Sequence, residues 1–175
     1  IKMYHDLPQY FVLELLDGLL WPGHPLGKSL AGTAETVMNL SNRDLKKFHE
    51  TYYAPANMVV AACGNVKHEK ILNLVKKKFG KLQNINKKWE YLKVSDVRDQ
   101  PHVHFFKKNI EQMHLALGIP AFDEKHKDRY VLSLLSILLG GNMSSRLFVE
   151  VREKRGLAYS ISSSYKTLHD TGLFM

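Results

Sequence analysis

Residues 140–160 read GGNMSSRLFVEVREKRGLAYS, and this stretch joins the end of one helix to the start of a strand. An apolar helix over residues 128–139 is expected to stop at the two glycines that open the stretch. The hydroxyl of Ser144 or Ser145 is then expected to cap a short second helix, because it can accept a hydrogen bond from an N–H group of the first turn.

The second half of the stretch predicts a sharp change from helix to strand. Three cations close the short helix, where they suit the negative end of the helix dipole, and Gly156 follows at the position of a left-handed cap. Residues 157–165 then alternate as a strand with one buried face. Arg152 and Tyr159 flank this junction.

The remaining sequence predicts an α+β fold, with helices layered on a mainly antiparallel sheet. Ser41 and Asp44 have the spacing of a reciprocal helix cap. The apolar run 58–63 suits a strand covered on both faces, with Cys63 as a small apolar filler. Further helices are expected over residues 8–21, 41–54 and 69–79, and further strands over 102–106, 112–119 and 171–175.

Composition bounds the class of protein. The chain of 175 residues is 45% hydrophobic and 24% charged, as is usual for a soluble globular protein, and no apolar run is long enough to span a membrane. The net charge of +8 is spread over helix ends and a linker without interleaved aromatic residues, so we interpret it as surface charge and predict no nucleic-acid partner. A single cysteine excludes an internal disulfide and fits a reducing compartment.

Two separated blocks of motifs carry a family resemblance. Residues 140–160 are one block, and the second reads His24-Pro-Leu-Gly27, Gly32-Thr33, Ser41-x-x-Asp44-Leu45, Tyr52-Tyr53, Asn57-Met-Val-Val60 and Gly64-Asn65. With the second block, this stretch resembles the pitrilysin/insulinase family of zinc metallopeptidases, in the branch that includes mitochondrial processing peptidase. The resemblance covers nearly the whole chain, but the family's zinc motif, His-x-x-Glu-His, does not occur in it.

The resemblance implies a division of the chain. Residues 1–80 would be the C-terminal part of a first, zinc-binding α+β unit, 81–100 a linker, and 101–175 the N-terminal part of a second, substrate-binding unit without zinc. Residues 1–8 resemble the tail of the helix that carries the third zinc ligand. All three ligands are therefore expected before Ile1, with zinc in the full-length parent and no metal in this chain.

The histidines offer no alternative metal site at the sequence level. His102 and His104 lie on one face of an expected strand, and Glu111 and His114 have a spacing used on helices where a strand is expected. No pair has the His-x-x-x-His helical spacing that zinc favours. The resemblance makes the loop of His24 structural rather than catalytic.

Arg152 and Tyr159 are the candidate site residues. The resemblance implies that Tyr159 is catalytic, donating its hydroxyl to the developing oxyanion, and that both residues bind substrate. On spacing alone, a solvated helix-end cation and a half-buried strand residue explain the pair better, and it is the intact flanking motif that favours the functional role. Arg146 and Glu150, one turn apart, are expected to form a local ion pair.

The resemblance implies that the chain is a fragment of a zinc metalloendopeptidase that hydrolyses peptides enclosed between two homologous domains, and that the chain alone is inactive. The alternative is a non-catalytic partner subunit that binds peptide or scaffolds a complex. Expected partners are a peptide substrate, the missing portions of the parent or a homologous subunit, and a second copy of the chain through an apolar face at Leu134, Leu135 and Leu138. We expect no membrane partner and a cytoplasmic location, with the mitochondrial matrix as the alternative.

Overall fold

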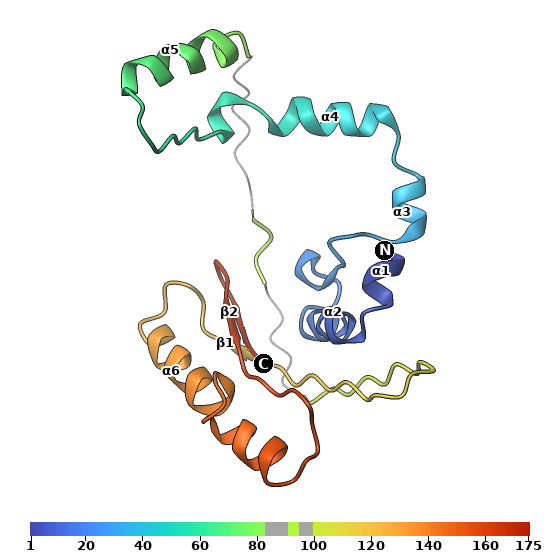
Figure 1. Cartoon of the computed structure of the whole chain (residues 1–175). Helices are drawn as coiled ribbons and strands as arrows, with labels where there is room; N and C mark the ends of the chain where they lie inside the picture. The colour runs from blue at the N-terminus through green and yellow to red at the C-terminus, as the bar shows by residue number, and fades with distance from the viewer. Residues whose placement is uncertain (83–90, 95–99) are drawn as a thin grey trace. The chain divides into compact units, whose positions relative to one another are not determined.

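A computed structural model describes residues 1–82, 91–94 and 100–175. The chain forms two compact units, one from residues 1–33 together with 92–175 and one from residues 34–91 (Figure 1). We call them the first and the second unit. Most of the expected linker over residues 81–100 lies outside the described residues. The division of the parent protein at this linker stays a prediction.

In its described residues, the first unit contains three helices, two short helical turns and a small sheet. The expected helices over residues 8–21 and 128–139 are present as α2 and α6. The elements are α1 (Lys2–His5), α2 (Pro8–Leu20), η1 (Pro25–Gly27), β1 (Ile119–Ala121), α6 (Arg129–Gly140), η3 (Phe148–Glu153), β2 (Tyr165–Thr167) and β3 (Gly172–Phe174).

The sheet is antiparallel, with strand order β1–β3–β2. On the central strand, Leu173 lies opposite Pro120 on one side and Lys166 on the other, and its side chain is 0% exposed. A Cβ atom added at Gly118 would lie 3.0 Å from side-chain atoms of both Leu16 and Leu173, so helix α2 packs against the sheet at this point. Helices on an antiparallel sheet confirm the predicted α+β class.

Two long-range contacts fix the helices of the first unit. Ser136 on α6 and Ser163 exchange hydrogen bonds, because each hydroxyl donates to the other's carbonyl oxygen, at 3.0 and 2.7 Å. A Cβ atom at Gly140 would lie 2.3 Å from the Ser163 nitrogen, so the absence of a side chain permits this close approach. Asp17 on α2 forms a salt bridge with Lys166 of β2, with 3.0 Å between the carboxylate oxygen and the ammonium nitrogen.

The second unit consists of helices joined by turns: α3 (Ala34–Met38), α4 (Asn42–Tyr52), η2 (Pro55–Asn57) and α5 (His68–Phe79). The predicted cap of α4 is confirmed. The Ser41 hydroxyl accepts from the Asp44 N–H at 3.2 Å, and the Asp44 carboxylate accepts from the Ser41 N–H at 3.0 Å. Ala54 is the only buried hydrophobic residue among those described in this unit.

Several expected strands are absent or shorter than predicted. Residues 58–63 and 102–106 form no strand, and Cys63 is exposed rather than a buried filler. The strand predicted over 112–119 is replaced by β1, which only begins at Ile119, and that over 157–165 by β2, which only begins at Tyr165. A pattern of apolar residues can favour an extended strand, but the backbone hydrogen bonds of a β-sheet form only where a neighbouring strand supplies the partners. The strand predicted over 171–175 is present as β3.

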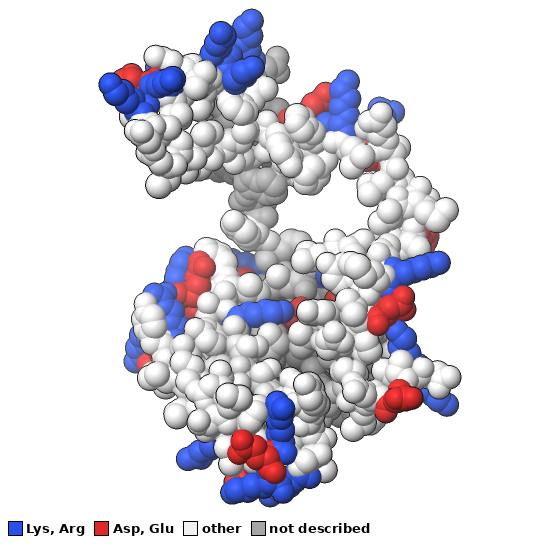
Figure 2. All heavy atoms as spheres, viewed as in Figure 1, with Lys and Arg blue, Asp and Glu red and all other residues white. Residues whose placement is uncertain are grey.

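Apolar side chains remain exposed on α6. Leu134, Leu135 and Leu138 are 62%, 43% and 64% exposed, as expected from the sequence, while Leu132 and Ser136 of the same helix are buried. Lys and Arg side chains occupy several separate places on the face shown in Figure 2, with Asp and Glu side chains among them.

In the part of the chain that the structure describes, no helix is long and apolar enough to cross a membrane.

Candidate functional site

The candidate site is built on the turn that follows α6. The side-chain oxygen of Asn142 accepts a hydrogen bond from the Ser144 N–H at 2.9 Å, in the turn that precedes the helical residues. The predicted serine cap is wrong, because η3 has no side-chain cap. The Ser145 hydroxyl is buried and has no hydrogen-bond partner among the described residues.

The next segment is wound as a π-helix, η3, and then reverses. Gly156 has a φ of +61°, a left-handed conformation that glycine adopts without steric cost, which confirms the predicted cap. The Gly156 N–H donates to the Arg152 carbonyl at 3.0 Å, and the Leu157 N–H donates to the Val151 carbonyl at 3.0 Å. The chain thus folds back over the end of η3 and carries Tyr159 toward it.

Arg152 and Tyr159 are brought together by this reversal. The guanidinium carbon of Arg152 lies over the Tyr159 ring, 5.0 Å from its centroid, and also over the Phe148 ring, 4.8 Å from its centroid. Both distances are within the range of cation–π attraction. Tyr159 is 85% exposed. That these two residues bind substrate stays a prediction; they are adjacent, with Tyr159 exposed and Arg152 half-buried.

The structure adds Phe148 to the site, and the sequence analysis missed it. The residue lies four positions before Arg152, the separation at which side chains on one helical face meet. That spacing was the available signal. The family motif includes Arg152 and Tyr159 but not Phe148.

Glu150 is held by cations other than the predicted one. Its carboxylate accepts from the Lys154 ammonium at 2.6 Å and lies 3.4 Å from an Arg155 nitrogen. The expected pair with Arg146 is wrong, because Lys154 is also one turn away and stands in the favourable order, with the carboxylate N-terminal to the cation. The hydrogen bond from Lys154, reinforced by its charge and that of Arg155, lowers the pKa of Glu150 below its ordinary value of 4.5.

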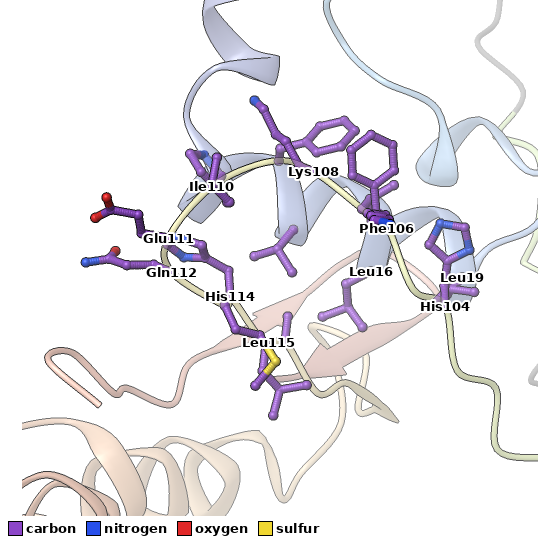
Figure 3. Close-up of a pocket in the computed structure, with 17 residues that line it drawn as sticks. Leu16, Leu19, His104, Phe106, Lys108, Ile110, Glu111, Gln112, His114 and Leu115 are labelled. Carbon is purple, nitrogen blue, oxygen red and sulfur yellow. The ribbon is translucent and has the colours of Figure 1, made fainter. Parts of the chain in front are cut away.

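A pocket of about 370 Å³ lies elsewhere in the first unit, between α2 and residues 104–116 (Figure 3). Most of its lining is apolar, including Leu16 and Leu19 of α2, and His104, Glu111 and His114 also border it. In Figure 3 these three polar side chains lie at separate places around the pocket and do not converge.

Across residues 1–82, 91–94 and 100–175, no group of three His, Cys, Asp or Glu side chains could hold a metal ion. The residues present therefore do not fit a zinc ion.

His24 is occupied by backbone contacts. Its Nδ1 accepts from the Leu26 N–H at 3.2 Å, and its Nε2 lies 3.2 Å from the Leu92 carbonyl oxygen. With the proton on Nε2, both nitrogens form hydrogen bonds. This arrangement agrees with the structural role expected for the loop.

Comparison with known proteins places the chain among peptidases. The family model described as the peptidase M16 inactive domain matches residues 39–175. A protein of Mycobacterium tuberculosis named an uncharacterized zinc protease is 37% identical over 174 residues, which are 98% of this chain and 40% of that protein. This chain thus spans about two fifths of the length of that curated relative.

Two solved structures share the fold. A protease from Helicobacter pylori matches with a TM-score of 0.61 and 29% identity, over 86% of this chain and 37% of that chain. A peptidase M16 inactive domain from Pseudomonas fluorescens matches with a TM-score of 0.76 over 99% of this chain and 42% of that chain. At 23% identity, the second likeness concerns the fold alone.

Proposed function

This chain belongs to the M16 peptidases, through their inactive domain, and on that premise we propose that it is the metal-free, peptide-contacting part of a zinc metalloendopeptidase. The observation that carries the proposal is the contact between the half-buried Arg152 and the exposed Tyr159, with 5.0 Å from guanidinium carbon to ring centroid. The relatives' names, which describe zinc proteases, support the reaction class. The described residues would not hold the zinc, so its ligands belong to the rest of the parent protein.

In this proposal Tyr159 and Arg152 do different work. The Tyr159 ring contacts Arg152 while most of the residue remains exposed, so its hydroxyl can donate to the oxyanion that develops when a peptide carbonyl is attacked. The Arg152 guanidinium binds oxygen atoms of the peptide before and during that step. Both roles concern binding and charge stabilisation.

In the same proposal, the parent protein is a member of the processing-peptidase branch, and its two homologous domains enclose the peptide. The bacterial origin of the relatives supports the cytoplasm over the mitochondrial matrix as the compartment.

The test is hydrolysis of peptides by the intact protein that contains this chain. We expect activity that a zinc chelator abolishes and added zinc restores, and no bound zinc in this chain alone. Arg152→Ala should raise KM more than it lowers kcat, because it removes a charge that binds before the transition state as well as in it. Lys127→Ala, in a different part of the chain, is the matched control.

A protein that binds peptides but cleaves none, with or without zinc, would contradict the enzymatic proposal. That result would favour the alternative of a non-catalytic subunit that binds peptide or scaffolds a complex.

We also propose that the isolated chain associates with itself through α6. The exposed leucines of α6 form an apolar face, and removing this face from water would be favourable. Leu134→Glu combined with Leu138→Glu should shift sedimentation toward the monomer. A wild-type chain that stays monomeric at high concentration would contradict this.

A further inference from the structure

Two aromatic rings, not one, contact Arg152. The Phe148 and Tyr159 centroids lie 4.8 and 5.0 Å from its guanidinium carbon. Phe148 comes from the same helical segment, η3, and Tyr159 from the segment that returns after Gly156. The side chain is thereby restrained from two directions, and an arginine that is restrained before binding loses less entropy when it binds a ligand.

The charge of Arg152 is not neutralised by its neighbours. Glu150, two residues away, is engaged by Lys154 and Arg155. Among the residues that the structure describes, the Arg152 side chain forms no ion pair and donates no hydrogen bond. Ring contacts through the guanidinium carbon leave the N–H groups of Arg152 available to an acceptor.

We infer that Phe148 and Tyr159 hold Arg152 as a binding site for a carboxylate of the peptide, with Phe148 as its positioning residue. A planar guanidinium with available N–H groups matches a carboxylate through two parallel hydrogen bonds. A peptide carbonyl offers one oxygen and no charge, so it uses this geometry less fully. The inference rests on the proposed function and adds to it a preference for peptides that carry an acidic side chain or a free C-terminus.

The experiment compares three quenched-fluorescent peptide libraries of one length, using the intact protein. The acid library contains Asp and Glu and has a free C-terminus. The amide library contains Asn and Gln instead and has an amidated C-terminus. The third library contains Asp and Glu but is amidated, so it separates the two sources of carboxylate. Rates at low substrate concentration give kcat/KM, and competition with a labelled peptide gives the affinity.

We expect the wild-type protein to prefer the acid library, and Arg152→Gln to reduce that preference by roughly ten- to a hundredfold, because hydrogen bonds to charged groups are the strong ones. Phe148→Leu should reduce the preference by roughly two- to fivefold, mainly through KM, as expected for one lost cation–π contact. Phe148→Tyr retains a ring and should restore the preference. A loss caused by misfolding would be visible as a lowered melting temperature and would affect all libraries equally.

A structural readout keeps the positioning role separate from activity. In intact protein with isotope-labelled arginine, the ring currents of Phe148 and Tyr159 should shift the Arg152 Nε–H resonance, which Arg152→Lys identifies by its absence. Phe148→Leu should move this resonance and Phe148→Tyr should leave it near its original position. An unmoved resonance in Phe148→Leu overturns the positioning role.

The remaining outcomes are also decisive. Equal use of the acid and amide libraries by the wild-type protein overturns the carboxylate site, even where hydrolysis supports the proposed function. Selective binding of the acid libraries without hydrolysis supports the site and contradicts the enzymatic proposal. Absence of any binding overturns both.

Discussion

Each of the two units of this chain is stabilised internally by a different kind of interaction. In the first unit, residues far apart in sequence bury one another: Leu173 is fully enclosed, and Ser136 and Ser163 bond across 27 positions. In the second unit, Ala54 is the only buried hydrophobic residue among those described, and α4 is fixed at its start by a cap between neighbours, Ser41 and Asp44. Long-range burial therefore dominates the stability of the first unit, and local hydrogen bonds shape the second.

The largest effect on stability is expected from Leu173→Ala. The substitution removes a completely buried side chain from the central strand and should lower the free energy of unfolding by about 2–5 kcal/mol. Urea denaturation followed by Trp21 fluorescence, with Trp89 replaced by Phe in all variants, measures it in the first unit. Leu30→Ala, at a fully exposed position of the first unit, is the control and should change the free energy by less than about 0.5 kcal/mol. Equal effects of the two would show that the first unit has no specific core.

A smaller loss should follow Gly140→Ala. The new Cβ atom would lie 2.3 Å from the Ser163 nitrogen, so the backbone must shift, at a cost of about 1–3 kcal/mol. Gly18→Ala is the matched control, because its nearest atom, the Gly27 carbonyl oxygen, is at an ordinary contact distance of 3.5 Å. Alanine favours the helix, so Gly18→Ala should raise the melting temperature. A lowered melting temperature for Gly18→Ala alone would contradict the packing described here.

The smallest effect is expected in the second unit. Ser41→Ala removes the hydroxyl that caps α4 and should cost about 1 kcal/mol of helix stability, visible as lost ellipticity at 222 nm. Ser29→Ala, outside the cap, is the control. No loss of ellipticity would mean that contacts outside the cap hold α4.

The same cap has a defined pH dependence. Hydrogen bonds from the Ser41 hydroxyl and N–H lower the pKa of Asp44 below its ordinary value of 3.8. The stabilisation is therefore fully present above pH 3.8 and is lost as the pH falls through the lower pKa of the folded state. In Ser41→Ala the helix content should begin to fall at a higher pH than in the wild-type chain. Identical acid transitions would exclude the cap as their cause.

The contrast between local and long-range interactions also explains which features could be predicted from the sequence. The cap of α4, the limits of α2 and the reversal at Gly156 depend on neighbouring residues, and all three were predicted correctly. Residues 58–63 have the composition of a buried strand, but a strand also needs partners that no local pattern specifies. They form none in the structure.

The candidate site was predicted only in part, for the same reason. The family resemblance selected Arg152 and Tyr159, and the pattern of helix end, glycine and strand placed them on either side of a turn. Their contact, the second ring at Phe148 and the engagement of Glu150 by Lys154 depend on how η3 is wound and on how the chain returns after it. Several cations lie within reach of Glu150, and the sequence does not decide among them.

The central claim, that Tyr159 acts on the peptide and not on the fold, is tested most directly by Tyr159→Phe in the intact protein. The substitution deletes one hydroxyl and keeps the ring that contacts Arg152. We expect kcat to fall by roughly 10²–10³, the loss typical of one oxyanion donor, with zinc content and melting temperature unchanged. An intact kcat with a lowered melting temperature would contradict the account, because Tyr159 would then serve packing alone.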